Sequence, residues 1–113
     1  MRPDEIYLAS FPFGGGAGMK LRPVLLLTGP VGSAPEVLAA YISSVIPPTL
    51  LPTDMILDPT AAGHASLNLK TISVLRLHKL ATIHARNIVR RLGELTPSLA
   101  AEVDGKLRLF LSL

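Results

Sequence analysis

The sequence contains no cysteine and no tryptophan, and its aromatic residues are limited to two tyrosines and three phenylalanines. Without cysteine there are no disulfides, thiol nucleophiles or thiolate metal ligands. So few rings cannot hold a nucleic acid mainly by stacking on its bases. We expect the rings of Tyr41, Phe11 and Phe13 in the core.

Long apolar runs are also missing, although apolar residues make up 49% of the chain and charged residues only 17%. The most apolar stretch, residues 45–57, is interrupted by three prolines and is shorter than the roughly 20 residues that cross a bilayer. Asp4 and Glu5 stand where a signal peptide would carry a basic flank. We therefore expect a single domain over residues 1–113, located in the cytoplasm, with a real core and no membrane association.

Acidic residues are absent from two long stretches, residues 6–35 and 59–93, in a chain of net charge +3. The first stretch contains Lys20 and Arg22. The basic residues of the second stretch are Lys70, Arg76, Lys79, Arg86, Arg90 and Arg91. Such asymmetry favours an anionic partner, either a nucleic acid or an acidic peptide. A basic face that is simply solvated is the open alternative.

Short apolar or alternating segments bounded by glycine and proline predict a mainly β protein. The expected strands are Glu5–Phe13, Arg22–Thr28, Glu36–Ser44, Asp54–Asp58, Thr71–Leu80 and Asn87–Leu92, the last ended by Gly93. The alanines of Glu36–Ser44 leave that segment ambiguous by composition. A glycine-rich loop, Gly14–Lys20, and a polar excursion, Pro59–Leu69, connect strands; the loop lacks the spacing of a Walker phosphate loop.

One helix is predicted at the C-terminal end. Thr96 followed by Pro97 is typical of an N-cap and first helical position. The apolar stripe after it has helical spacing and consists of Leu99, Val103, Leu107 and Phe110 or Leu111. The strands and helix together predict a small, strongly curved β-barrel with a packed C-terminal helix.

Three segments, in order, resemble the MazF/PemK family of toxins. They are Phe11-Pro12-Phe13 with Lys20–Leu27, then Ala39–Ser44, then Ser73–Ile83 continuing into Val89–Leu95. The resemblance implies an SH3-like barrel of the plasmid maintenance toxin fold that forms a two-fold homodimer. It also implies cleavage of single-stranded RNA (mRNA) without a metal or cofactor, and neutralisation by a cognate antitoxin peptide.

The family's functional pair falls on Arg22 and Ser43 in this sequence, which makes them the candidate catalytic residues. A guanidinium matches the geometry of a phosphate, and stabilising charge that grows in the transition state is usually the largest catalytic contribution. A guanidinium pKa above about 12 makes Arg22 a poor acid, so electrostatics comes first. Lys20, Ser44 and Lys79 are the candidate RNA contacts.

Two other functions stay open. On a related fold, toxins of the CcdB type poison DNA gyrase by binding alone, through the C-terminal helix. A serine at position 43, where a threonine is more usual, leaves open a catalytically decayed barrel that only binds a partner. His78 and His84 have pKa values suited to acid–base chemistry, but nothing in the sequence brings them together. The spacing of His64, His78 and His84 fits no metal-ligand pair, so no metal site is expected.

Overall fold

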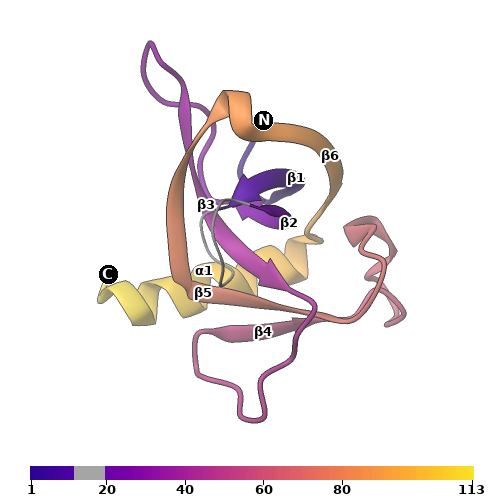
Figure 1. Cartoon of the computed structure of the whole chain (residues 1–113). Helices are drawn as coiled ribbons and strands as arrows, with labels where there is room; N and C mark the ends of the chain where they lie inside the picture. The colour runs from indigo at the N-terminus through magenta and orange to yellow at the C-terminus, as the bar shows by residue number, and fades with distance from the viewer. Residues whose placement is uncertain (12–19) are drawn as a thin grey trace.

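The structure is a computed structural model that describes residues 1–11 and 20–113. Six strands form one antiparallel sheet in the order β4-β5-β3-β2-β1-β6. Their bounds are β1 Glu5–Phe11, β2 Lys20–Leu26, β3 Glu36–Ser43, β4 Asp54–Leu57, β5 Ser73–His84 and β6 Ile88–Glu94. Figure 1 shows β5 and β6 arching around β1 and β2, with helix α1 (Pro97–Leu111) lying along the sheet. The mainly β barrel-like fold with a C-terminal helix, predicted from the sequence, is confirmed.

Alternating side chains on the strands supply two apolar cores, one on each face of the sheet. On the face toward α1, the helix-side core includes Ile6, Leu25 and Ile42. On the opposite face, the barrel core includes Phe11, Val24 and Tyr41, so the rings of Phe11 and Tyr41 are buried as expected, whereas Phe13 lies outside the described residues. Burying both faces requires a near-continuous apolar run, as in β2, and it also explains the small, apolar alanines that left β3 ambiguous by composition.

The long strand β5 contributes to both cores because its pairing with β3 shifts. Ala40 pairs with Leu80 and the next residue, Tyr41, pairs with Arg76, which leaves three extra residues on β5 at this point. Because side chains alternate between the two faces of a sheet, a shift by an odd number of residues moves the later side chains of β5 to the opposite face from the one that unbroken pairing would give. The strand predicted to end at Leu80 therefore continues to His84, since its last residues pair with the first half of β3.

Gly93 does not end β6, contrary to the prediction, but lies within the strand beneath a short 3₁₀ turn, η1 (Ala65–Leu67). A Cβ at this position would meet the carbonyl oxygen of Ser66 at 2.2 Å and that of Leu67 at 2.5 Å. The glycine is needed for this close approach of two backbones. The excursion predicted as merely polar thus contains the turn η1, which buries Leu67 against the sheet.

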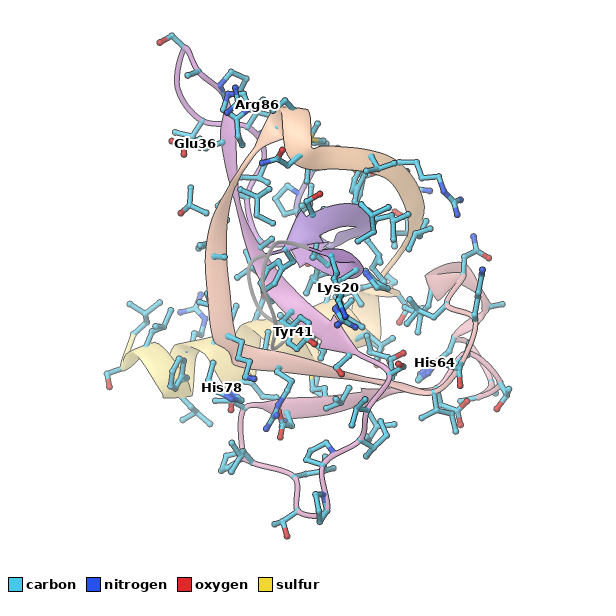
Figure 2. All side chains as sticks on the ribbon, in the orientation of Figure 1. Lys20, Glu36, Tyr41, His64, His78 and Arg86 are labelled. Atoms are coloured by element: carbon cyan, nitrogen blue, oxygen red, sulfur yellow. The ribbon has the colours of Figure 1, made fainter. Side chains whose placement is uncertain are left out.

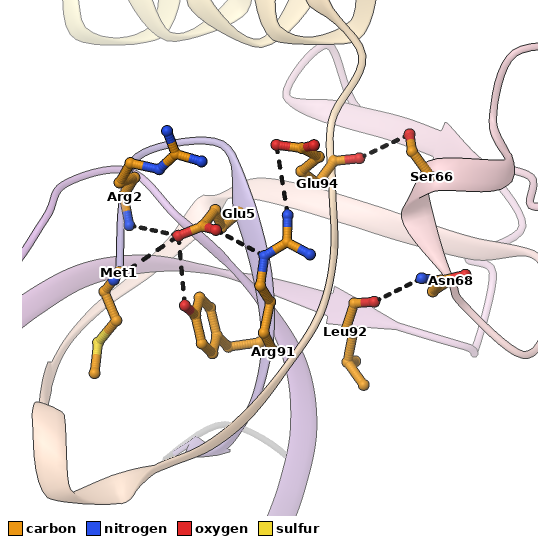
Figure 3. Close-up of polar contacts among 9 residues, drawn as sticks. Met1, Arg2, Glu5, Ser66, Asn68, Arg91, Leu92 and Glu94 are labelled. Carbon is orange, nitrogen blue, oxygen red and sulfur yellow. Dashed lines mark hydrogen bonds and ion pairs between the residues drawn. The ribbon is translucent and has the colours of Figure 1, made fainter.

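Two further contacts fix η1 to β6 (Figure 3). The hydroxyl of Ser66 donates to the carbonyl of Glu94 at 3.1 Å, and the side-chain amide of Asn68 donates to the carbonyl of Leu92 at 2.9 Å. Asn68 ends the turn with a left-handed φ of 51°, a conformation that asparagine tolerates well. The segment after η1 is therefore held rigidly beside β6.

A buried carboxylate joins the first strand to the last, also in Figure 3. Glu5 accepts a hydrogen bond from Arg91 Nε at 2.7 Å and another from the Arg2 amide at 2.7 Å. Burial acts to raise the pKa of Glu5, but these bonds and the positive charge of Arg91 outweigh it and lower the pKa overall. Arg91 therefore has a structural ion pair with Glu5, whereas its neighbour Arg90 forms no ion pair among the described residues.

Helix α1 begins as predicted, with the Thr96 hydroxyl accepting a hydrogen bond from the Leu99 amide at 3.2 Å. Leu99 and Val103 are buried, but Phe110 and Leu111 are about half exposed, at 46% and 49%. The predicted apolar stripe thus packs only as far as Leu107, because the C-terminal end of the helix projects past β5 (Figure 1). Within the described ranges, no helix has the length and apolar character needed to span a membrane.

Candidate functional site

The candidate catalytic pair, Arg22 and Ser43, lies at the ends of adjacent strands. The pairing of β2 with β3 ends at Val24 and Tyr41, which face each other directly. Two residues further along each strand, and so on the same face of the sheet, are Arg22 and Ser43. Alternation along the two strands therefore starts both side chains, at their Cβ atoms, on the face of the sheet that carries Tyr41.

The hydroxyl of Ser43 is buried, with 7% of the residue exposed, and accepts a hydrogen bond from the Val45 amide at 3.1 Å. This bond orients the oxygen and leaves its hydrogen available to donate. Ser44, the next residue, is exposed and points to the opposite face, as alternation requires. The chain thus presents one hydroxyl on each side of the end of β3.

A pocket of about 550 Å³ opens beside Arg22 on the side of Ser44. Its wall combines apolar side chains, such as Leu8 and Leu92, with polar ones, and none of its lining residues is acidic. The cations and main polar groups that line it are Arg22, Lys70, Arg90, Ser44, Asn68 and Ser73. Ser43, Lys20 and Lys79 do not line this pocket.

The Nε of Arg22 is the one buried side-chain nitrogen or oxygen without a hydrogen-bond partner among residues 1–11 and 20–113. A buried donor without a partner is costly, and in a folded protein such a group calls for an explanation. A guanidinium donor held this way, beside a pocket without acidic residues, is well suited to donate a hydrogen bond to an anionic group. This is the strongest functional signal in the structure.

Lys20 and Lys79 lie at opposite ends of a stacked aromatic pair. The rings of Phe11 and Tyr41 are 5.3 Å apart and nearly parallel, at 15°. Lys20 pairs with Phe11 across the β1–β2 ladder, and Lys79 Nζ lies 5.5 Å from the centre of the Tyr41 ring. Figure 2 shows Lys20 and Tyr41 near the open end of the barrel, where β2 begins and β3 ends. Both lysines therefore flank the face that carries Arg22 and Ser43.

A second charged cluster at this end of the sheet is structural. Asp54 on β4 accepts from Arg76 Nε at 2.9 Å and from the Leu51 amide at 2.8 Å. Burial raises the pKa of Asp54, but the bonds from Arg76 and Leu51 outweigh it and lower the pKa overall. Beside them, burial and the charge of Arg76 lower the pKa of His78, which shares a hydrogen bond of 2.9 Å with Thr53.

The three histidines occupy separate places. His64 lies near η1 and His78 near the C-terminal half of α1, on either side of the barrel in Figure 2. His84 ends β5, where its Nδ1 accepts a hydrogen bond from the Arg86 amide at 3.0 Å. Six residues of extended strand, a length of about 20 Å, separate His78 from His84. The two histidines therefore do not form an acid–base pair.

Sequence reasoning missed four residues that line the pocket: Lys70, Asn68, Ser73 and Arg90. The signal that could have found two of them was the acid-free stretch of residues 59–93, which contains both Lys70 and Arg90. The position of Asn68 depends on how η1 packs on Gly93, which no local pattern shows. Residues 14–19 of the glycine-rich loop, predicted to connect two strands, lie outside the described residues.

Fold and site together define a small basic β-barrel with an arginine near the start of β2 whose buried Nε has no hydrogen-bond partner among the described residues. A family model described as PemK-like, MazF-like toxin of type II toxin–antitoxin system matches residues 2–111. The chain belongs to this toxin family, as the resemblance predicted. Its sequence matches none of the curated proteins.

Solved structures agree on the fold. The toxin MazF-mt6 of Mycobacterium tuberculosis is 24% identical, with a TM-score of 0.73 over 96% of this chain and 97% of that one. An endoribonuclease in complex with its cognate antitoxin, from a mycobacterial species, is 18% identical, with a TM-score of 0.69 over 100% and 96%. MazF of Deinococcus radiodurans is 20% identical, with a TM-score of 0.70 over 100% and 97%.

Proposed function

We propose that this chain is a toxin endoribonuclease that cleaves single-stranded RNA, mRNA in the cytoplasm, without a metal or cofactor. The observation that carries the proposal is the buried, unpartnered Nε of Arg22, a residue that lines a pocket without acidic residues together with Ser44. The family match supports it, as does the endoribonuclease named among the similar structures.

RNA carries its own nucleophile, the 2′-hydroxyl. Its oxygen bonds to the neighbouring phosphorus and loses its proton to solvent, while the bond from phosphorus to the 5′-oxygen breaks and that oxygen takes a proton from solvent. The products are a 2′,3′-cyclic phosphate and a 5′-hydroxyl. Arg22 stabilises the negative charge that grows on the phosphate oxygens, which is usually the largest catalytic contribution. Ser43, whose oxygen is fixed by the Val45 amide, donates its hydrogen to one of these oxygens.

The remaining predicted contacts extend this site along the RNA. Lys20 and Lys79 flank the Phe11–Tyr41 pair and provide two positive charges for the backbone. Ser44 lines the adjacent pocket, where its hydroxyl reaches a neighbouring nucleotide. The antitoxin, in turn, lays an acidic segment across the same basic surface and excludes RNA.

We further propose that the toxin acts as a homodimer. Exposed apolar side chains gather where Leu51, Leu109 and Phe110 line one groove. Leu109 is 84% exposed, which is unusual for a large apolar residue in a patch and indicates a surface that a partner covers. Light scattering of the purified chain should give twice the 12.0 kDa of one copy. Phe110→Asp should halve that mass.

The decisive test is cleavage of a single-stranded RNA in the presence of EDTA. The wild-type chain should produce fragments with 2′,3′-cyclic or 3′-phosphate ends. Arg22→Ala should lower the rate about 100-fold or more while the thermal unfolding curve shows a folded protein. Ser43→Ala should also lose activity, and Ser43→Thr should keep it. Undiminished cleavage by Arg22→Ala would remove this residue from the mechanism.

A non-enzymatic toxin on the same fold is the second candidate. The observation in its favour is the exposed apolar end of α1, where Leu109 and Leu113 are more than four-fifths exposed. The same EDTA assay separates the two. Intact RNA together with inhibited DNA gyrase supports the binding toxin, and intact RNA with active gyrase supports a barrel that only binds its antitoxin.

A further inference from the structure

The pocket beside Arg22 has a composition suited to one class of ligand. Three cations line it, Arg22, Lys70 and Arg90, and no lining residue is acidic. Apolar lining comes from leucines that include Leu8 on β1 and Leu92 on β6. A ligand that matches both needs an anionic group and a flat apolar body, as a nucleotide has in its phosphate and base. The volume of about 550 Å³ lies within the range of small-molecule sites.

Lys70 and Arg90 are free for such a ligand. Both are exposed, and neither forms an ion pair within the described part of the chain. By contrast, Arg91, the neighbour of Arg90 on β6, is held by Glu5, and Arg76 on β5 is held by Asp54. The chain therefore keeps two basic side chains at the pocket while it uses their neighbours to stabilise the fold.

The side-chain amide of Asn68, a polar group of the pocket, is held in place by the fold before any ligand binds. The amide nitrogen of Asn68 donates to the Leu92 carbonyl at 2.9 Å, and close packing at Gly93 holds the same segment against β6. Among the described residues, the side-chain oxygen of Asn68 accepts no hydrogen bond. An amide oxygen held in this way can accept from the amino group of a base at little cost in entropy.

Arg22 connects this pocket to the proposed cleavage site. It lies two residues beyond Val24 on β2, as Ser43 lies two residues beyond Tyr41 on β3, and it lines the pocket together with Ser44. The hydroxyls of Ser43 and Ser44 leave the end of β3 on opposite faces. Arg22 is thus the residue common to the proposed cleavage site and the pocket.

We propose that this pocket is a nucleotide subsite next to the cleaved bond, with Lys70 and Arg90 holding the phosphate and Asn68 reading the base. The assignment of the neighbouring bond rests on the proposed endoribonuclease function. The pocket's affinity for a nucleotide does not depend on it. Because the two cations touch the substrate away from the reacting bond, they act on binding more than on turnover.

The direct test uses the four nucleoside 3′,5′-bisphosphates as probes, each with one base and two phosphates, in calorimetric titrations of the full chain. The wild-type chain should bind at least one of them, with a preference among the bases. Arg90→Ala and Lys70→Ala should each weaken binding about tenfold, the effect of losing one phosphate contact. The matched control is Arg86→Ala, which removes an equally exposed arginine outside the pocket and should change affinity less than twofold.

Three results would overturn the subsite. One is unchanged nucleotide affinity in both variants, with their thermal unfolding at the wild-type temperature. Another is inorganic phosphate binding as tightly as every bisphosphate, which would make the pocket an anion site without base recognition. The third is an octamer of glutamate binding more tightly than the nucleotides and losing affinity in Arg90→Ala, which would make it a protein-docking site.

Cleavage measured in parallel separates this proposal from the function on which it rests. If the subsite is correct, Arg90→Ala raises KM for RNA and leaves kcat nearly unchanged, whereas Arg22→Ala lowers kcat. Normal KM in Arg90→Ala with intact wild-type cleavage would refute the subsite alone. Absence of cleavage by the wild-type chain, with nucleotide binding that depends on Arg90, would refute the nuclease and leave the subsite in place.

Discussion

Arg76 of β5 and Asp54 of β4 face each other directly and form a two-point ion pair, with Nε 2.9 Å from Oδ1 and Nη2 3.3 Å from Oδ2. The Asp54 side chain is fully buried, and that of Arg76 is 18% exposed. This pair attaches the short edge strand β4 to the sheet, at the same cross-strand position as Tyr41.

Asp54→Asn should lower the free energy of unfolding by about 3 kcal/mol at pH 7, because it leaves the Arg76 charge without its buried partner. Since the folded state lowers the pKa of Asp54, its contribution is fully present above the unfolded pKa of about 3.9. It is lost as the pH falls through the lower folded pKa. Urea unfolding at a series of pH values should show the gap between wild type and variant closing below about pH 4.

The matched control for this prediction is Glu102→Gln, which removes one negative charge from the exposed surface of α1. We expect it to change stability by less than about 0.5 kcal/mol at any of these pH values. A gap between wild type and Asp54→Asn that stays constant down to pH 2 would show that the ion pair is not its cause.

Two glycine-to-alanine substitutions should have opposite effects. At Gly93 a Cβ would meet two backbone oxygens within 2.5 Å, so Gly93→Ala should cost about 1–3 kcal/mol and displace η1 from β6. At Gly105, inside α1, a Cβ meets nothing within 4 Å, so Gly105→Ala should stabilise the chain by about 1 kcal/mol. Thermal unfolding measures both. Equal effects of the two changes would contradict the close packing of η1.

Lys79 should contribute one backbone contact to RNA binding. Lys79→Gln should weaken binding of a 2′-O-methyl RNA, which cannot be cleaved. It should also reduce the slope of log affinity against log salt concentration by about one, the effect of losing one phosphate contact. Fluorescence anisotropy at several salt concentrations measures this. Arg86→Gln, which changes the same charge at η2 (Ala85–Asn87) beyond the end of β5, should leave the salt dependence as it is. If both variants behave alike, the lysine acts only through net charge.

Local chemistry made much of the fold predictable. The cap at Thr96 and the strands β1 to β4 follow from nearest-neighbour preferences and alternation, and their positions were right to within two residues where the structure describes them. The far end of β5 and the role of Gly93 were not predictable. Both depend on contacts with segments distant in sequence, namely the first half of β3 and the turn η1.

The candidate site, like the fold, was only partly predictable from the sequence. The amino-acid types that a phosphate needs, and the resemblance at Arg22 and Ser43, could be read from the sequence; their catalytic role stays a prediction. That Lys70, Asn68 and Arg90 border the pocket of Arg22 could not be read. Nothing local to these residues indicates that η1 folds back beside β6.

The sequence by itself determined the mainly β character of the fold and its basic charge, because these depend on composition and on patterns within a few residues. The toxin family and the pair Arg22 and Ser43 came from the resemblance of three ordered segments to that family. The tertiary structure decided which of these residues meet. Strand register sets Arg22 and Ser43 on one face, and a backbone contact at Gly93 builds the pocket wall. Both result from pairing between distant segments, whose energy is cooperative and is not encoded at any single position.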